Sequence, residues 1–147
     1  MIKSKEKKEI GRFAVEFEIV NNEDLANAKR GHMDPAKVRR KTIKGRVDPG
    51  ATLLVLPLAI VKELGLPVKK KKVKVRYADG RRGLRTEVDD IRIYLQGRDS
   101  IFTAIGEPNR ETALIGAVGL EVLDFLVDCR QQRLVPRDPD YVLSEIE

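Results

Sequence analysis

Cysteine, histidine and aromatic residues are scarce in this sequence. Its 147 residues include one Cys, one His, no Trp, three Tyr and four Phe. A single cysteine excludes a disulfide within the chain, and together with a single histidine it argues against a Cys/His metal cluster. The few aromatic side chains offer little for the stacking of nucleic-acid bases.

Long apolar segments are also missing. No apolar run approaches the about 20 residues that cross a membrane. The charged residues 1–9 are followed by no apolar segment of the kind found in secretion signals. We therefore expect a cytoplasmic protein without a membrane partner.

Charged residues, in contrast, are abundant. They make up 35% of the chain, above the roughly 25% of an average globular domain, and the net charge is +6. The net positive charge favours weak association with acidic partners and says nothing about the fold. A chain of this length is most simply one domain with its own core. We expect that domain over residues 12–138, between a charged, flexible N-terminus at 1–11 and a C-terminal tail at 139–147.

Apolar and polar residues alternate along much of the chain at the period of a half-buried strand. The pattern predicts strands over 13–19, 42–47, 53–56, 73–77, a returning strand through 85 and 88, then 91–95, 101–105, 113–116, 125–128 and 133–136. Asn22 is expected to cap a short helix. Pro57 opens another that ends at Gly65, and a third short helix is predicted over 118–123.

The four consecutive lysines at 69–72 raise the possibility of nucleic-acid binding, because lysine clusters neutralise phosphates. Over 72–77, however, the basic side chains alternate with apolar ones, which is typical of the solvated face of a strand. Nucleic-acid binding is therefore the disfavoured alternative.

A single carboxylate lies between two apolar runs in the stretch RVDPGATLLVLP at 46–57. Asp48, Pro49 and Gly50 are turn residues, and an aspartate often bonds its own backbone two residues on, which is a sufficient structural reason for Asp48. An ionised carboxylate beside core segments is nevertheless costly without partners. The second explanation is that the turn holds Asp48 at the floor of a cleft.

Several short motifs follow this turn in a fixed order: Leu-Val-Leu-Pro, a helix ending in Gly-Leu-Pro, the hairpin signal Asp79-Gly80, Leu114-Ile115-Gly116, a short helix, Val-Asp and Arg-Leu-Val-Pro. Taken together over residues 12–138, they resemble the retropepsin-like aspartic proteases, in particular their small bacterial single-domain branch.

The resemblance implies a closed all-β barrel with one or two short helices, a flap hairpin, and a homodimer that hydrolyses protein or peptide substrates without a metal or cofactor. It implies that Asp48 is the catalytic carboxylate. The active-site loop is completed by Pro49, Gly50, Ala51 and Thr52. The flap would consist of Tyr77, Ala78, Asp79, Gly80, Arg81 and Arg82, and the support of the loop would consist of Leu114, Ile115 and Gly116.

One catalytic aspartate per chain suits a dimer, because two facing carboxylates share a proton. One then acts as base on a water while the other polarises the substrate carbonyl. This chain has Pro49 where the family has Thr or Ser, whose hydroxyl and N–H cross-link the two loops; proline supplies neither group. The alternative function is therefore a catalytically impaired dimer that binds peptides or serves in assembly.

Overall fold

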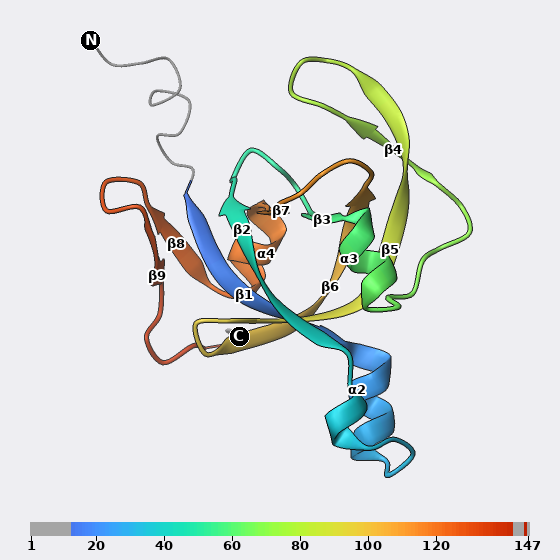
Figure 1. Ribbon diagram of the computed structural model, residues 1–147. Coiled ribbons are helices and arrows are strands. Elements are labelled where there is room, and N and C mark those ends of the chain that lie inside the picture. The colour runs from blue at the N-terminus through green and yellow to red at the C-terminus, as the bar shows by residue number, and fades with distance from the viewer. Residues whose placement is uncertain (1–12, 143–145, 147) are drawn as a thin grey trace.

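The computed structural model describes residues 13–142 and residue 146 (Figure 1). Its strands are β1 Ala14–Asn21, β2 Arg40–Val47, β3 Leu54–Pro57, β4 Val73–Arg76, β5 Arg82–Leu95, β6 Arg98–Glu107, β7 Ala113–Ile115, β8 Phe125–Asp128 and β9 Arg133–Pro136. Its helices are α2 Asn22–Lys29, α3 Leu58–Glu63, α4 Ala117–Val122 and a 3₁₀ helix at Pro35–Lys37. The predicted N-terminal segment 1–11 lies outside the described residues.

The main sheet closes on itself. Its strand order is β1-β2-β7-β3-β6-β5-β4, and a further pairing of β1 with β5 joins the ends of a six-stranded ring. β4 pairs with β5 alone among the named strands and lies outside the ring, and β8 and β9 form a separate hairpin. The predicted closed all-β barrel is confirmed. It carries three short α-helices in the described residues, where the resemblance implies one or two.

Figure 1 shows the barrel with the β4–β5 hairpin rising from one end and α2 extending from the other. The barrel interior holds one cluster of buried apolar side chains. Ile19, Leu56 and Ile91 are among its fully buried members, each on a different strand of the ring. Leu120 of α4 and Leu123, which follows this helix, belong to the same cluster, so the segment that follows β7 is packed against the barrel.

The strand β5 differs from its prediction. The two segments predicted around 85–88 and 91–95 are one continuous strand of 14 residues. Val88 pairs with Ala104 and Ile91 with Phe102, so β5 has one residue more than β6 between these pairs. The extra residue is accommodated by a bulge, with Asp90 at a φ of 51°. The bulge interrupts the alternation of apolar residues, which is why the pattern predicted two strands.

A fully buried asparagine joins three elements. The Asn21 side chain accepts a hydrogen bond from the Asp24 N–H at 3.1 Å and caps α2, so the expected capping role of Asn22 is wrong by one residue. Its amide also donates to the carbonyls of Leu64 and Gly65, at 2.9 and 3.2 Å, just beyond α3. These bonds satisfy backbone groups that a helix end leaves without partners.

The predicted boundary between domain and tail remains a prediction, although the start of the tail contacts the barrel. The buried Arg98 guanidinium donates to the Leu123 and Asp124 carbonyls, at 2.9 and 2.8 Å, and to the Asp138 carbonyl. Tyr141 lies over the same guanidinium at 4.3 Å. The β8–β9 hairpin and residues 138–141 are thus held to β6 by one buried cation.

A second charged group is buried at the start of α2. Asp24 is only 3% exposed, and it accepts hydrogen bonds from the Arg39 Nε at 2.8 Å, Nη2 at 3.0 Å and backbone N–H at 3.1 Å. The side-chain hydrogen bonds from Arg39 hold the pKa of the Asp24 carboxyl below its ordinary value of 3.8. A carboxyl with a lower pKa in the folded state stabilises the fold above its unfolded pKa and loses that contribution as the pH falls.

Replacing Asp24 by alanine should therefore destabilise the protein in a pH-dependent way. We expect a loss of about 1.5–3 kcal/mol at pH 7, the usual value of hydrogen bonds to a charged group. The loss should begin to shrink as the pH falls below about 4, where Asp24 of the unfolded chain becomes protonated, and it should vanish below the lower pKa of the folded carboxyl. Urea unfolding of the wild type and Asp24→Ala across this pH range measures both effects.

Glu63→Ala is the matched control, because it breaks the pair between Lys41 and Glu63, whose side chains are 42% and 50% exposed. Exposed pairs contribute about 0–1 kcal/mol. Equal losses for the two variants would contradict the structural role assigned to Asp24.

Candidate active site

Asp48 occupies a hydrogen-bonded turn at the end of β2. Its carbonyl accepts from the Ala51 N–H at 3.0 Å, and its Oδ1 accepts from the Gly50 N–H at 3.0 Å. The Asp48 side chain is half-buried, while Pro49 and Gly50 are exposed. A turn with aspartate first and proline second is favoured by the backbone geometry that each residue prefers.

The same local turn recurs among the described residues, so it does not by itself identify a functional carboxylate. Asp34, Asp48 and Asp138 each precede a proline and accept from the N–H two residues on, at 2.9, 3.0 and 2.9 Å. Asp48 differs in how it is anchored. It follows the fully buried Val47, and its own N–H donates to the Ile115 carbonyl of β7 at 3.0 Å.

The far side of the turn is clamped against the start of α4. The Ala117 N–H donates to the Ala51 carbonyl at 2.8 Å. At Gly116 the two segments come so close that a Cβ atom would lie 2.6 Å from the Ala51 oxygen and 2.7 Å from the Leu53 oxygen. Only glycine fits this approach, so the turn that carries Asp48 is held between β7 and α4.

The β4–β5 hairpin ends in a tight turn. The Tyr77 N–H donates to the Arg81 carbonyl at 2.8 Å, and the Gly80 N–H donates to the Tyr77 carbonyl at 2.9 Å. Gly80 has a φ of +89°, which glycine adopts without strain. Arg81 is paired with Asp79 at 2.7 Å and lies 5.0 Å from the Tyr77 ring centre.

This hairpin is fixed to the end of β6 by Glu107. The Tyr77 hydroxyl donates to both Glu107 carboxylate oxygens, at 2.7 and 3.0 Å, and the Arg85 Nε donates to one of them at 2.6 Å. Burial raises the pKa of Tyr77, and the hydrogen bond to Glu107 acts in the same direction. The hydroxyl therefore stays protonated and serves as a donor, and the Glu107 charge is compensated within the chain.

A cleft of about 530 Å³ separates the hairpin from the loop that follows β6. Tyr77 and Arg81 line one side, and residues 107–112 line the other. Its volume lies in the range of about 300–1,000 Å³ that is common for ligand sites.

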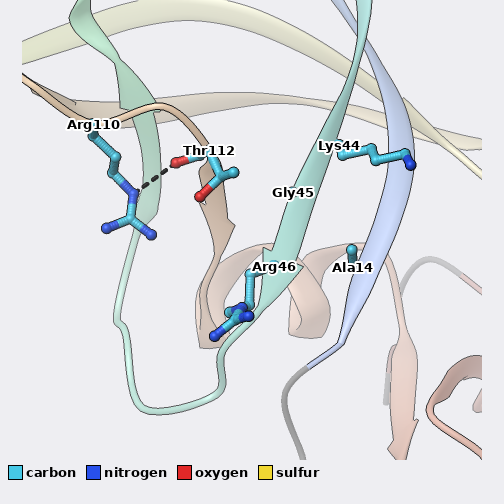
Figure 2. Close-up of a pocket in the computed structure, with 6 residues that line it drawn as sticks. All are labelled: Ala14, Lys44, Gly45, Arg46, Arg110 and Thr112. Carbon is cyan, nitrogen blue, oxygen red and sulfur yellow. Dashed lines mark hydrogen bonds between the residues drawn. The ribbon is translucent and has the colours of Figure 1, made fainter. Parts of the chain in front are cut away.

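A smaller pocket of about 200 Å³ adjoins this loop, and three of its six lining residues are basic (Figure 2). Lys44, Arg46 and Arg110 contribute the charges. Figure 2 shows the Arg46 and Arg110 side chains extending toward the turn from β2 to β3, whereas Lys44 extends toward β1. Burial lowers the pKa of the Arg110 guanidinium, against the opposing charges of Glu107 and Asp48, and the Arg46 charge lowers it further. Arg110 thus lies within electrostatic reach of Asp48.

The residues expected to form the site occupy two groups. The loop Asp48, Pro49, Gly50, Ala51 and Thr52 lies against its expected support, Leu114, Ile115 and Gly116, through the bonds described above. The residues expected to form the flap occupy the hairpin, with Ala78, Asp79, Gly80 and Arg82 exposed and without a part in lining either cavity.

Sequence reasoning missed Glu107, Arg85 and Arg110, since it placed residue 85 only within a strand and named no candidate between the strands 101–105 and 113–116. The available signal was a pair of opposite charges flanking Pro-Asn directly after a buried strand. That pattern is common in surface loops, so it does not show that the two charges face a cleft.

The lysine run at 69–72 is partly neutralised within the chain. Lys69 pairs with Glu87 and lies 3.7 Å from Asp89, and the Lys72 Nζ lies 3.5 Å from the Thr86 hydroxyl. The hydrogen bond to Glu87 raises the pKa of Lys69. Over 72–76 the lysine and arginine side chains are exposed and alternate with half-buried valines, as predicted.

No group of three or more His, Cys, Asp or Glu side chains within residues 13–142 is arranged to hold a metal ion. In the same part of the chain, no helix has the length and apolar character needed to cross a membrane.

Comparison with known proteins finds similarity only to solved structures. No family model matches this chain, and no curated protein matches it. Among solved structures, it is similar to the solution structure of the Simian Foamy Virus (mac) protease, with 16% sequence identity and a TM-score of 0.47. The match covers 76% of this chain and 94% of the viral one. At this level of similarity, functional inferences depend on the residues of this chain itself.

Gly116→Ala should loosen the turn that carries Asp48. The added Cβ meets backbone oxygens that cannot move without displacing the turn, and such overpacking usually costs about 1–3 kcal/mol. Chemical denaturation measures the loss.

The matched control is Gly119→Ala in α4, where a Cβ meets only the Ile115 Cγ2, at an ordinary 3.6 Å. Alanine is favoured over glycine within a helix by about 0.5–1 kcal/mol, so this variant should be as stable as the wild type or more stable. A Gly116→Ala variant of unchanged stability would show that the clamp is not tight.

Proposed function

We propose that this protein is an aspartic-type endopeptidase that acts as a homodimer, with Asp48 of each chain as the catalytic carboxylate. The observation that carries the proposal is the anchoring of Asp48. Among the three Asp-Pro turns, only Asp48 follows a fully buried barrel residue and donates its N–H to β7. It also lies within electrostatic reach of Arg110, which lines the substrate-sized cleft.

The chemistry follows from two such carboxylates facing one another with a single shared proton. The ionised carboxylate takes a proton from a water molecule, whose oxygen attacks the carbonyl carbon of the peptide bond. The protonated one donates a hydrogen bond to the carbonyl oxygen and stabilises the charge that develops there. Collapse of the tetrahedral intermediate breaks the C–N bond, and the leaving nitrogen takes the proton that the first carboxylate had received from the water, which restores the singly protonated pair. The β4–β5 hairpin serves as the flap over the bound peptide.

Asp48→Asn should abolish peptide hydrolysis, because the amide can act neither as base nor as the acid of the pair. We expect a fall in kcat of at least about 10²–10⁴-fold, the usual contribution of a positioned acid or base. The measurement is cleavage of an unfolded protein substrate, followed by mass spectrometry, with folding checked by circular dichroism.

Asp34→Asn is the matched control, because Asp34 forms the same Asp-Pro turn with the same hydrogen bond to the N–H two residues on. This exposed turn lies at the 3₁₀ helix, away from the cleft, and the variant should keep full activity. Hydrolysis that survives unchanged in Asp48→Asn would end the proposal.

A second candidate function is a peptide-binding or assembly module with the same dimer and little catalysis. Pro49 favours it, since a proline beside Asp48 contributes neither an N–H nor a hydroxyl to hold the two loops together. Pro49 is exposed in the single chain. In a dimer, this residue would therefore be accessible to the active-site loop of the other protomer.

Pro49→Thr separates the two functions. Added loop-to-loop hydrogen bonds, each worth roughly 0.5–1.5 kcal/mol, should lower the dimer dissociation constant roughly two- to tenfold. Sedimentation equilibrium measures this change, and Pro35→Thr in the matching Asp34 turn should leave it unaltered. The endopeptidase proposal expects turnover from the natural chain as well; turnover in Pro49→Thr alone would favour the module.

A further inference from the structure

Arg110 occupies an unusual place, because it lines both the 530 Å³ cleft and the smaller basic pocket. It lies in the exposed loop between β6 and β7, but its own side chain is half-buried. The charges of Glu107, Arg46 and Asp48 all act on its guanidinium. A fixed positive charge is thus present at the junction of the two cavities, within electrostatic reach of the proposed catalytic carboxylate.

The hydrogen-bonding capacity of this guanidinium is only partly used. Its Nε donates to the Thr112 carbonyl at 2.6 Å (Figure 2), which orients the group. Among residues 13–142, no acceptor bonds to its two terminal nitrogens. An arginine stays protonated at all ordinary pH values and presents a planar fork of donors. A half-buried fork without an acceptor favours an anion with two oxygens, of which a carboxylate is the natural match.

The neighbouring charged groups do not fill this role. Glu107 is already bonded to the Tyr77 hydroxyl and to Arg85. On the opposite wall of the cleft, Arg81 is paired with Asp79. An acceptor other than water for the two terminal nitrogens would therefore come from outside residues 13–142, and the cleft is the place from which a bound peptide would approach.

We propose that Arg110 is a specificity-determining residue that binds the carboxylate of an Asp or Glu side chain of the substrate, near the scissile bond. The inference rests on the proposed function, since the cleft is taken as the place where the peptide lies. Its consequence is a preference for acidic peptides. The net charge of +6 acts in the same direction by attracting acidic chains.

The test is a pair of peptides that differ only by Glu or Gln near the cleaved bond. A proteome-derived peptide library digested by the wild type supplies the cleavage sites, which we expect to be enriched in Asp and Glu within three positions. For the matched pair, kcat/KM should be roughly tenfold higher for Glu than for Gln, a difference typical of a charge-assisted hydrogen bond. The gain should lie mainly in KM.

Three variants decide whether Arg110 is the cause. Arg110→Gln should bring the Glu/Gln ratio close to one while the Gln peptide is still cleaved. Arg110→Lys, which keeps the charge without the fork, should retain part of the ratio. Arg130→Gln makes the same change of charge at the exposed β8–β9 turn and should leave the ratio unaltered. A ratio unchanged in Arg110→Gln, or a wild type that prefers Gln, would overturn the proposal.

A binding measurement keeps this test separate from the endopeptidase proposal. Fluorescein-labelled nonapeptide pools with Glu or Gln at the centre are titrated with the full-length Asp48→Asn chain and followed by anisotropy. Tighter binding of the Glu pool, lost in Asp48→Asn combined with Arg110→Gln, supports the role of Arg110 even if the natural chain hydrolyses nothing. Equal binding of the two pools contradicts it whatever the activity.

Discussion

The rest of the site depends on one close approach of backbone to backbone, at Gly116. There the start of α4 passes the carbonyls of Ala51 and Leu53 at a distance that excludes any side chain. Because the Asp48 N–H is bonded to β7 at the same time, the turn between β2 and β3 is held at both ends. The catalytic role proposed for Asp48 requires a carboxylate in a fixed geometry. Here that rigidity comes from the barrel and α4. The hydrogen bond from the N–H two residues on does not suffice, since Asp34 and Asp138 accept the same bond.

The charges around the cleft are arranged asymmetrically. On one wall, the carboxylate Glu107 is compensated by Tyr77 and Arg85 and serves to fix the hairpin to the barrel. A few residues away, Arg110 is oriented by one bond and keeps a donor fork toward both cavities. The compensated Glu107 carboxylate holds the structure together, whereas the Arg110 guanidinium, whose terminal nitrogens bond to no acceptor in residues 13–142, fits the recognition role proposed for it. The hairpin and the following loop therefore have different roles although their charges lie close together.

Much of the fold could be predicted from the sequence, because alternation of apolar residues reports which side of a strand is buried. The barrel strands, the Asp79-Gly80 turn and the helix between Pro57 and Gly65 follow from local patterns and turn residues. The failures have equally specific causes. A bulge at Asp90 breaks the alternation and made one strand look like two. The cap of α2 was placed at Asn22 because the buried role of Asn21, which also bonds the end of α3, depends on contacts 43 and 44 residues away.

The sequence by itself determined that an aspartate stands in a proline turn between two apolar runs, and that a glycine follows the strand Leu114-Ile115. Those features are local, since they depend on the conformational preferences of neighbouring residues. Only the tertiary structure decided that Gly116 lies against Ala51, that Tyr77 donates to Glu107, and that the charge of Asp48 acts on Arg110. These contacts join residues 30 to 65 positions apart along the chain, and closure of the barrel brings them together. No pattern of neighbouring residues encodes such distances.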